Sequence, residues 1–234
     1  MKKIILDEVT LLGIDCLDLD RLMFAAGICQ KHIRFAQVKL LSDIGGNNPG
    51  IVRIAPVKSK EEYSRFILKE LYRFIETKYV LVFQWDGFIL NPFAWNDLFL
   101  QYDYIGAPWF INDDYNVGNG GFSLRSRKLM EMVALDDHID KCHPEDNVIC
   151  RTYGEYLRKK GFSFAPAKIA ELFSVEGAKW EGQFGFHRAE ISNWNIHDYT
   201  DAITDSKYIG LFKHYFGGDA VNYHALKPDT SFIS

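Results

Sequence analysis

Apolar residues fill positions 79–83 without polar alternation, and the run ends abruptly at Gln84, Trp85 and Asp86, with Gly87 next. β-Branched and aromatic residues in such a run predict a strand covered on both faces, as in a mostly parallel sheet. Asp86 then lies at the carboxyl end of that strand, the edge where open α/β sheets bind ligands. A carboxylate there points to metal or hydroxyl binding. The alternative is that Asp86 caps a helix over residues 91–97 or closes a turn.

The same pattern predicts alternating strands and helices along the rest of the chain. Asp18 or Asp20 is placed to cap the first helix. Ser59 and Glu62 form a capping box, in which each side chain accepts from the other residue's free backbone N–H at the start of the second helix. This alternation favours an α/β fold with a mostly parallel central sheet. The expected strands cover residues 9–14, 35–41, 51–54, 79–83, 104–109, 117–125 and 162–165, and the expected helices cover residues 19–33, 59–74, 126–133 and 146–160.

Composition bounds the class of protein. The chain has 234 residues, of which 47% are apolar and 15% aromatic, so a single domain with a sizeable core is expected. Lysine and arginine total 27 against 31 aspartates and glutamates, which gives a net charge of −4, and no basic block stands out. This balance argues against a nucleic-acid-binding protein, because neutralising phosphates requires clustered cations.

Cysteine usage and hydropathy bear on the compartment. Cys16, Cys29, Cys142 and Cys150 are scattered, without a CxxC pair or the His/Cys spacing of a zinc site. They are therefore expected to be reduced thiols in a cytoplasmic protein. Acids interrupt the N-terminal apolar run early and no stretch approaches membrane length, so neither a signal peptide nor a membrane span is expected. A membrane-linked substrate would then be reached by peripheral contact.

Glycines are concentrated in the segment VGNGGFSLR at 117–125, where Gly118, Gly120 and Gly121 surround Asn119. Glycines at this density let a backbone approach a ligand closely or adopt a positive φ. The spacing is neither that of a Walker loop nor GxGxxG, so it is a weak signal for phosphate binding. A bulged hairpin is the alternative interpretation.

Two acids and a histidine complete the set of candidate residues. Glu145 and Asp146 come at the start of a predicted helix, where free N–H groups favour negative charge, so helix capping alone would also explain them. His187 ends the segment GQFGFH, which is rich in glycine and aromatic residues. The histidines that follow it show no sharp ligand spacing.

Four segments taken in order resemble the nucleotide-sugar glycosyltransferases of the GT-A fold. They are QWDGF at 84–88, YDYIGAPW at 102–109, VGNGGFSLRS at 117–126 with PED at 144–146, and FGFH at 184–187. The chain is also similar to a bacterial glycosyltransferase-like family labelled a domain of unknown function. The resemblance implies a single Rossmann-like GT-A domain over residues 1–187. Residues 188–234 are then expected to be a C-terminal extension packed on the same domain.

In such enzymes a DxD motif at the end of a central strand holds a divalent cation on the donor diphosphate. The matching stretch here is Gln84-Trp85-Asp86, so glutamine replaces the first acid of the motif. The resemblance implies Asp86 and His187 as ligands of Mn²⁺ or Mg²⁺, with diphosphate oxygens and waters completing the shell. The cation would stabilise the charge that develops on the leaving phosphate.

The resemblance also implies roles in proton transfer and substrate binding. The acidic pair after the glycine-rich strand is where an inverting enzyme holds its base, so Asp146, ahead of Glu145, is expected to take the proton of the acceptor hydroxyl. The backbone of Asn119, Gly120 and Gly121 would lie under a sugar. The other expected substrate-binding residues are Gln84, Trp85 and Trp109, whose indoles would stack on a sugar or base, and Asp15 and Asp43, which would meet the base or ribose.

The leading hypothesis is a cytoplasmic, inverting glycosyltransferase that moves a sugar from a nucleotide-sugar donor to a glycan or lipid-linked acceptor. The second is a non-catalytic module that binds a nucleotide sugar or a glycan, in which Gln84 marks a broken DxD motif. A third, a metal-dependent nucleotidyl or phosphoryl transferase, would need more carboxylates near Asp86 than the sequence provides.

Overall fold

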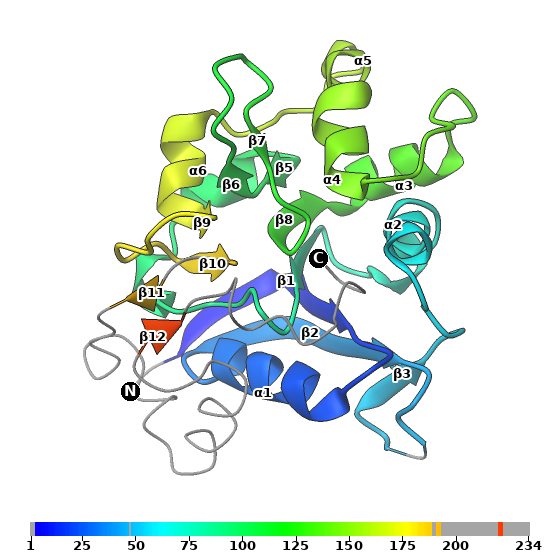
Figure 1. Ribbon diagram of the computed structural model, residues 1–234, viewed down its shortest axis with the longest axis vertical. Coiled ribbons are helices and arrows are strands. Elements are labelled where there is room, and N and C mark those ends of the chain that lie inside the picture. The colour runs from blue at the N-terminus through cyan, green and yellow to red at the C-terminus, as the bar shows by residue number, and fades with distance from the viewer. Residues whose placement is uncertain (1–2, 47, 189–190, 193–219, 222–234) are drawn as a thin grey trace.

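The computed structural model of the protein describes residues 3–46, 48–188, 191–192 and 220–221 (Figure 1). Most of the extension expected at residues 188–234 therefore lies outside the described residues. The strands are β1 (Ile4–Ile14), β2 (Ile33–Ser42), β3 (Ile51–Arg53), β4 (Tyr79–Phe83), β5 (Tyr104–Ile105), β6 (Ala107–Pro108), β7 (Val117–Gly118), β8 (Phe122–Ser126), β9 (Ser174–Glu176), β10 (Gly185–His187), β11 (Ile191–Ser192) and β12 (Ala220–Val221).

The helices are α1 (Leu19–Gln30), α2 (Lys60–Lys69), α3 (Arg127–Leu135), α4 (Glu145–Asn147), α5 (Gly154–Lys159) and α6 (Ala167–Phe173). Three 3₁₀ helices cover Leu71–Phe74, Pro92–Ala94 and Asp97–Gln101, and a π-helical turn covers Val148–Thr152. Within the described part of the chain, no helix is both long and apolar enough to cross a bilayer.

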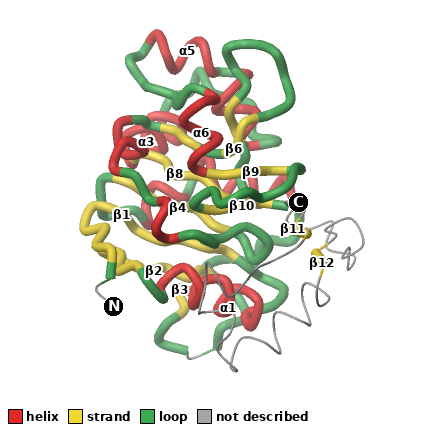
Figure 2. Tube along the Cα trace, turned by 90° about the vertical axis from the view of Figure 1, so that its left-hand side faces the viewer, coloured by secondary structure: helices red, strands yellow, loops and turns green. Residues whose placement is uncertain are grey.

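The central sheet has six strands in the order β3-β2-β1-β4-β8-β5, which Figure 2 shows stacked through the middle of the protein. β1 pairs in parallel with β2 and β4, and β2 pairs in parallel with β3. β8 runs antiparallel to both β4 and β5. The expected α/β fold, with a Rossmann-like and mostly parallel central sheet, is therefore confirmed.

The two faces of the sheet carry separate apolar cores, because side chains alternate along each strand. Leu11 and Leu81 belong to the core that α1 covers. Leu12 and Val82 belong to the core on the opposite face, under α2 and α3. All five residues of β4 are buried, as its uninterrupted apolar sequence predicts.

The helix starts confirm most of the predicted caps. The carboxylate of Asp18 accepts from the backbone N–H groups of Asp20 and Arg21 at the start of α1. Ser59 caps α2 by accepting from Glu62 N–H. The reciprocal half of the predicted capping box is wrong, because the Glu62 carboxylate accepts from Lys58 N–H instead, at 2.6 Å.

Several predicted elements differ from the structure. The strand expected over 117–125 divides into β7 and β8, the helix expected over 146–160 into α4, a π-helical turn and α5, and the helix expected over 59–74 into α2 and a 3₁₀ helix. The first helix ends at Gln30 rather than at residue 33, because Ile33 already pairs with Ile4 in the sheet. The strand expected over 104–109 divides at Gly106, so that β5 pairs with β8 and β6 with β7. The strand expected over 162–165 forms only an isolated bridge. The Ser163 N–H donates to the Asp103 carboxylate at 2.9 Å. This N–H is therefore not available for the backbone hydrogen bonds that a longer strand pairing would require.

A buried ion pair joins β1 to α1. Asp15, which follows β1, is fully buried, and its Oδ1 accepts from Leu17 N–H, Asp18 N–H and, at 3.0 Å, the guanidinium of Arg21. Arg21 Nε donates to the other carboxylate oxygen. The guanidinium also lies over the Trp85 ring, 5.0 Å from its centroid. Arg21 therefore connects the ends of two neighbouring strands.

Replacing Arg21 with Met is expected to destabilise the protein by ~3–5 kcal/mol, because it leaves the buried Asp15 carboxylate without a counter-charge. Urea denaturation measures the free energy of unfolding. Arg34→Met is the matched control, because Arg34 pairs with Asp7 at the surface, where both side chains are exposed. Equal effects of the two substitutions would contradict a structural role for the Asp15–Arg21 pair.

Candidate functional site

The antiparallel β4–β8 pair brings two sequence motifs to one edge of the sheet. Phe83, the last residue of β4, is registered opposite Phe122, the first residue of β8. The residues just after β4 therefore lie beside the residues just before β8. As a result QWDG at 84–87 and the glycine-rich segment at 118–121 meet.

A third segment reaches the same edge through backbone hydrogen bonds. Phe186 N–H donates to Phe88 O, and Arg188 N–H donates to Asp86 O. These contacts run β10 alongside the segment that follows β4, so that His187 lies next to Asp86.

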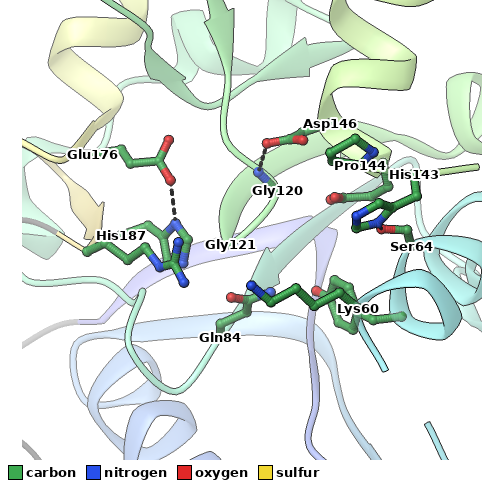
Figure 3. A pocket seen from close by; sticks show the side chains of 13 residues that line it. Lys60, Ser64, Gln84, Gly120, Gly121, His143, Pro144, Asp146, Glu176 and His187 are labelled. Carbon is green, nitrogen blue, oxygen red and sulfur yellow. Dashed lines mark hydrogen bonds and ion pairs between the residues drawn. The ribbon is translucent and has the colours of Figure 1, made fainter. Parts of the chain in front are cut away.

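A pocket of about 340 Å³ opens where these segments meet α2 and α4 (Figure 3). Several residues that the sequence singles out share this pocket, although they are far apart in the chain. They are Gln84, Gly120, Gly121, Glu145, Asp146 and His187. Residues that the sequence did not single out complete the lining, namely Lys60, Tyr63, Ser64, His143, Pro144, Glu176 and Arg188.

His187 lies between two carboxylates at the floor of the pocket. Its Nδ1 is 3.0 Å from Glu176 Oε1, and its Nε2 is 3.7 Å from Asp86 Oδ1 (Figure 3 shows the contact with Glu176). Arg188 Nε lies 3.9 Å from the other oxygen of Asp86. Burial alone would raise the pKa of Glu176, but the hydrogen bond from His187, the nearby charges of His187 and Arg188 and a hydrogen bond from Trp109 together lower it below its usual range. Glu176 is therefore held as a carboxylate.

Asp86 lies within a tight turn that two backbone hydrogen bonds of 3.1 Å between Gln84 and Gly87 close, but its side chain takes no part in closing it. Asp86 is 1% exposed, and neither of its carboxylate oxygens has a hydrogen-bond partner among the described residues. It therefore caps no helix. His187 Nε2, 3.7 Å from Asp86 Oδ1, and Gln84 Oε1, two residues before Asp86 in the chain, are also buried and without a hydrogen-bond partner in the described structure. Buried acceptors without donors are costly, because each has lost its hydrogen bonds to water.

These atoms fit a divalent cation. A carboxylate oxygen, an imidazole nitrogen and an amide oxygen are all suitable ligands for such an ion. Within the described ranges, no group of three or more His, Cys, Asp or Glu side chains is placed to hold a metal. The protein would therefore contribute Asp86, His187 and Gln84, and the remaining positions would fall to substrate oxygens or water.

Asp146 lies on the opposite wall, at the start of α4. Its Oδ2 accepts from Gly120 N–H at 3.1 Å and its Oδ1 accepts from Asn147 N–H at 2.7 Å. Burial, followed by repulsion from Glu145 and Glu176, raises the pKa of Asp146 to about 7. A carboxylate with such a pKa is suited to accept a proton near neutral pH.

Glu145 is in a different environment from its neighbour. Its carboxylate accepts from Arg125 at 2.8 Å, and the Arg125 side chain is fully buried in β8. The same guanidinium lies over the Tyr104 ring and contacts Gly120 O. Glu145 is thus committed to a buried ion pair, whereas Asp146 faces the pocket without one. The two acids, of which the sequence resemblance favoured Asp146, therefore lie in different electrostatic environments.

The glycines allow these side chains to approach closely. A Cβ added to Gly120 would overlap the Glu145 carboxylate, and one added to Gly121 would overlap the His187 ring. Asn119 has a φ of 74°, and its Oδ1 accepts from Gly121 N–H at 3.0 Å, which fixes the turn. β7 pairs with β6 and β8 with β4 and β5, so the segment is not the bulged hairpin of the alternative interpretation.

Five predicted substrate-binding residues do not line this pocket, namely Asp15, Asp43, Trp85, Trp109 and Asn119, and the predicted metal ligand Asp86 lies outside the lining as well. Asp15 and Trp85 are both buried against Arg21. Asp43, which follows β2, lies beside Cys16, and the thiol of Cys16 forms a hydrogen bond with the carboxylate of Asp43. The Trp109 ring packs over Gly118, and its side chain forms a hydrogen bond with Glu176. Their contact with a substrate stays a prediction.

Among the lining residues that the sequence did not single out, Lys60, Tyr63 and Ser64 come from α2, and His143 and Pro144 come from the loop before α4. Lys60 extends across the pocket toward Gln84 (Figure 3). Ser64 Oγ lies 2.8 Å from His143 Nδ1. Lys60 and Ser64 belong to an ordinary amphipathic helix, so no local signal marked them. His143, by contrast, immediately precedes the PED segment and could have been considered with it.

The raised pKa of Asp146 predicts a pH dependence of stability. The folded protein holds this proton up to about pH 7, whereas the unfolded chain releases it near 3.8. Stability is therefore lost as the pH rises through this window. The free energy of unfolding of Asp146→Asn should increase relative to the wild type between these pH values, as urea titrations at each pH would measure.

Asp136→Asn is the control for this titration. A hydrogen bond from the Tyr156 hydroxyl lowers the pKa of Asp136, so its contribution changes below pH 3.8 instead. A difference between Asp146→Asn and wild type that stays constant over the window would contradict the raised pKa.

Comparison with known proteins places the chain in a family. Two solved structures are similar to it at low identity. One is the bifunctional IspDF from Campylobacter jejuni, with 10% identity, a TM-score of 0.39 and coverage of 61% of this chain and 47% of that one, so the chain spans about half of its length. The other is a glycosyltransferase involved in glycosylation of the major capsid of PBCV-1, with 12% identity, a TM-score of 0.44 and coverage of 81% and 95%.

No curated protein matches the chain. The family described as "Protein of unknown function (DUF5672)" matches residues 51–189, a range that includes β3 to β10 and every residue lining the pocket. The chain belongs to the DUF5672 family.

Proposed function

We propose that the protein is a glycosyltransferase that moves a sugar from a nucleotide-sugar donor to a glycan or lipid-linked acceptor, with inversion. The observation that carries the proposal is the pairing of two features across one pocket. Asp146, with a pKa of about 7, lies across the pocket from His187, and His187 and the buried Asp86 next to it carry acceptor atoms suited to a cation. Glycosyl transfer requires both a base for the acceptor and a countercharge for the leaving group.

Asp146 acts as the general base in this proposal. The acceptor oxygen forms a bond to the anomeric carbon, its proton passes to the Asp146 carboxylate, and the bond to the donor phosphate breaks with its electron pair on the phosphate. Gly120 N–H holds Asp146 Oδ2, which orients the carboxylate. Glu145 acts at a distance, because its charge raises the pKa of Asp146 while Arg125 neutralises much of that charge.

Positively charged groups of the pocket would stabilise the negative charge of the donor diphosphate. Lys60 and Arg188 line the pocket on the side of Gln84 and Asp86. Asp86, His187 and Gln84 would hold a divalent cation, Mn²⁺ or Mg²⁺. When bound, such an ion supplies electrostatic stabilisation of the leaving diphosphate. The cationic side chains add to this stabilisation and position the diphosphate across the pocket from Asp146.

A second candidate function is a module that binds a nucleotide sugar or a glycan without catalysis. The glutamine at position 84, where the resembling enzymes carry an acid, favours this candidate. The raised pKa of Asp146 favours the enzyme, because a binding module has no use for a carboxylate that accepts protons near pH 7. A metal-dependent nucleotidyl or phosphoryl transferase has less support, since Asp86 is the one carboxylate among the three candidate cation ligands.

A panel of UDP-, GDP-, dTDP- and CMP-sugars, each with and without Mn²⁺, tests donor binding by thermal shift. One donor class is expected to raise the Tm, and Mn²⁺ is expected to increase that shift. Asp86→Asn should remove the Mn²⁺-dependent part, and Asp137→Asn, at an exposed position, should not. No shift with any nucleotide sugar would contradict the assignment.

Asp146→Asn should lower transfer or slow donor hydrolysis by roughly 10²–10⁴-fold, because it removes the base. Donor affinity, measured by calorimetry, should stay within a few-fold of wild type. Asp137→Asn is again the matched control. Donor binding without any turnover in the wild type would favour the non-catalytic module, whereas unchanged turnover in Asp146→Asn would exclude this residue as the base.

A further inference from the structure

Glu176 and His187 are paired by the backbone as well as by their side chains. β9 and β10 run parallel, and Glu176 is registered directly beside His187. Neighbouring residues in register project from the same face of a sheet, so the carboxylate meets the imidazole at 3.0 Å. The contact is therefore fixed by the sheet rather than by a flexible loop.

The His187 ring has little freedom to turn. It is 5% exposed, and it packs against Gly87 and Gly121, where added Cβ atoms would lie 2.9 Å from the ring or closer. One ring nitrogen therefore always faces Glu176 and the other faces Asp86. The remaining variable is which nitrogen carries the proton.

The groups that face the two ring nitrogens determine which nitrogen carries the proton. A carboxylate can only accept hydrogen bonds, so Glu176 requires a proton on Nδ1. In the neutral imidazole, Nε2 then carries a lone pair. This lone pair faces Asp86 Oδ1 at 3.7 Å, and neither atom has a hydrogen-bond partner among the residues that the structure describes. A cation between them satisfies both, and no hydrogen bond spans 3.7 Å.

We propose that Glu176 is a positioning residue that holds His187 in the Nδ1–H tautomer, so that Nε2 is presented with Asp86 to a divalent transition-metal ion such as Mn²⁺. This inference rests on the cation of the proposed function. An imidazole ligand favours such ions over Mg²⁺ or Ca²⁺, which prefer an all-oxygen shell. Glu176 would not touch the ion, and it acts by orienting the ligand that does.

The alternative is a doubly protonated His187 that forms an ion pair with both acids. The two states differ in a direct observable, because ¹⁵N NMR distinguishes a protonated from an unprotonated ring nitrogen. The protein without metal would be examined at about pH 8. The chain has seven histidines, so subtracting the spectrum of His187→Gln assigns the signals of His187.

The expected spectrum shows Nδ1 protonated and Nε2 unprotonated. A protonated Nε2, in either the imidazolium or the other tautomer, would overturn the proposal. This measurement needs neither donor nor acceptor. Failure of the proposed glycosyl transfer is therefore distinguishable from failure of this inference.

Mn²⁺ affinity, measured by electron paramagnetic resonance of the free ion, provides the second test. Glu176→Leu keeps the approximate volume but removes the acceptor, and the Mn²⁺ affinity is expected to fall by about 10–100-fold. Glu176→Gln keeps an acceptor oxygen and should restore much of the affinity and the Nδ1–H signal. Glu181→Leu, an exposed glutamate in the same β9–β10 connection, is the matched control.

Circular dichroism confirms that each variant is folded before its affinity is compared. Equal Mn²⁺ affinity in the wild type and Glu176→Leu would overturn the positioning role. Mg²⁺ binding as tight as Mn²⁺ binding would overturn the assignment of the ion class.

Discussion

The antiparallel pairing of β8 with β4 is the constraint on which the pocket depends. In a purely parallel sheet, the residues that precede a strand and those that follow its neighbour lie at opposite edges. Here the reversed direction of β8 puts Gly120 and Gly121 beside Gln84 and Asp86. The mostly parallel part of the sheet supplies a rigid edge, and the one reversed strand brings a second motif to it. Gly121 then allows His187 to complete the floor, because no side chain intervenes.

The same arrangement places two adjacent acids, Glu145 and Asp146, in different environments. Glu145 and Asp146 are consecutive in sequence and share the start of α4. Arg125 reaches only Glu145, because it projects from the buried interior of β8 and its guanidinium bonds to that carboxylate. Asp146 has backbone donors but no cation at hydrogen-bonding distance among the contacts described, and burial together with two neighbouring acids raises its pKa. Different environments for neighbouring carboxylates are a general route to separate chemical roles.

Local sequence signals predicted what local physics determines. The apolar run of β4, the Asp18 cap and the polar residues after β4 follow from periodicity and helix-end chemistry, and the structure has them. Glu176 carries no such signal, because its role comes from the register of β9 with β10 and from a histidine later in the chain. Motif resemblance gathered Gln84, the glycines, the acids and His187. It could not show that α2 would contribute Lys60 and Ser64 to the same pocket.

Asp15 and Asp86 provide the sharpest contrast in the molecule. Each follows a central parallel strand, each is almost fully buried, and the sequence treats both as candidates for binding. The oxygens of Asp15 accept from two backbone N–H groups and from Arg21, so the fold itself satisfies its charge. Those of Asp86 accept no hydrogen bond from the described residues, and Arg188 approaches one of them only to 3.9 Å. Burying a carboxylate without hydrogen bonds opposes folding, and a ligand that supplies positive charge would recover part of that free energy. In the proposed function, Asp86 is the residue that binds, because a cation or its substrate would regain the free energy that burying an unsatisfied carboxylate withholds from folding.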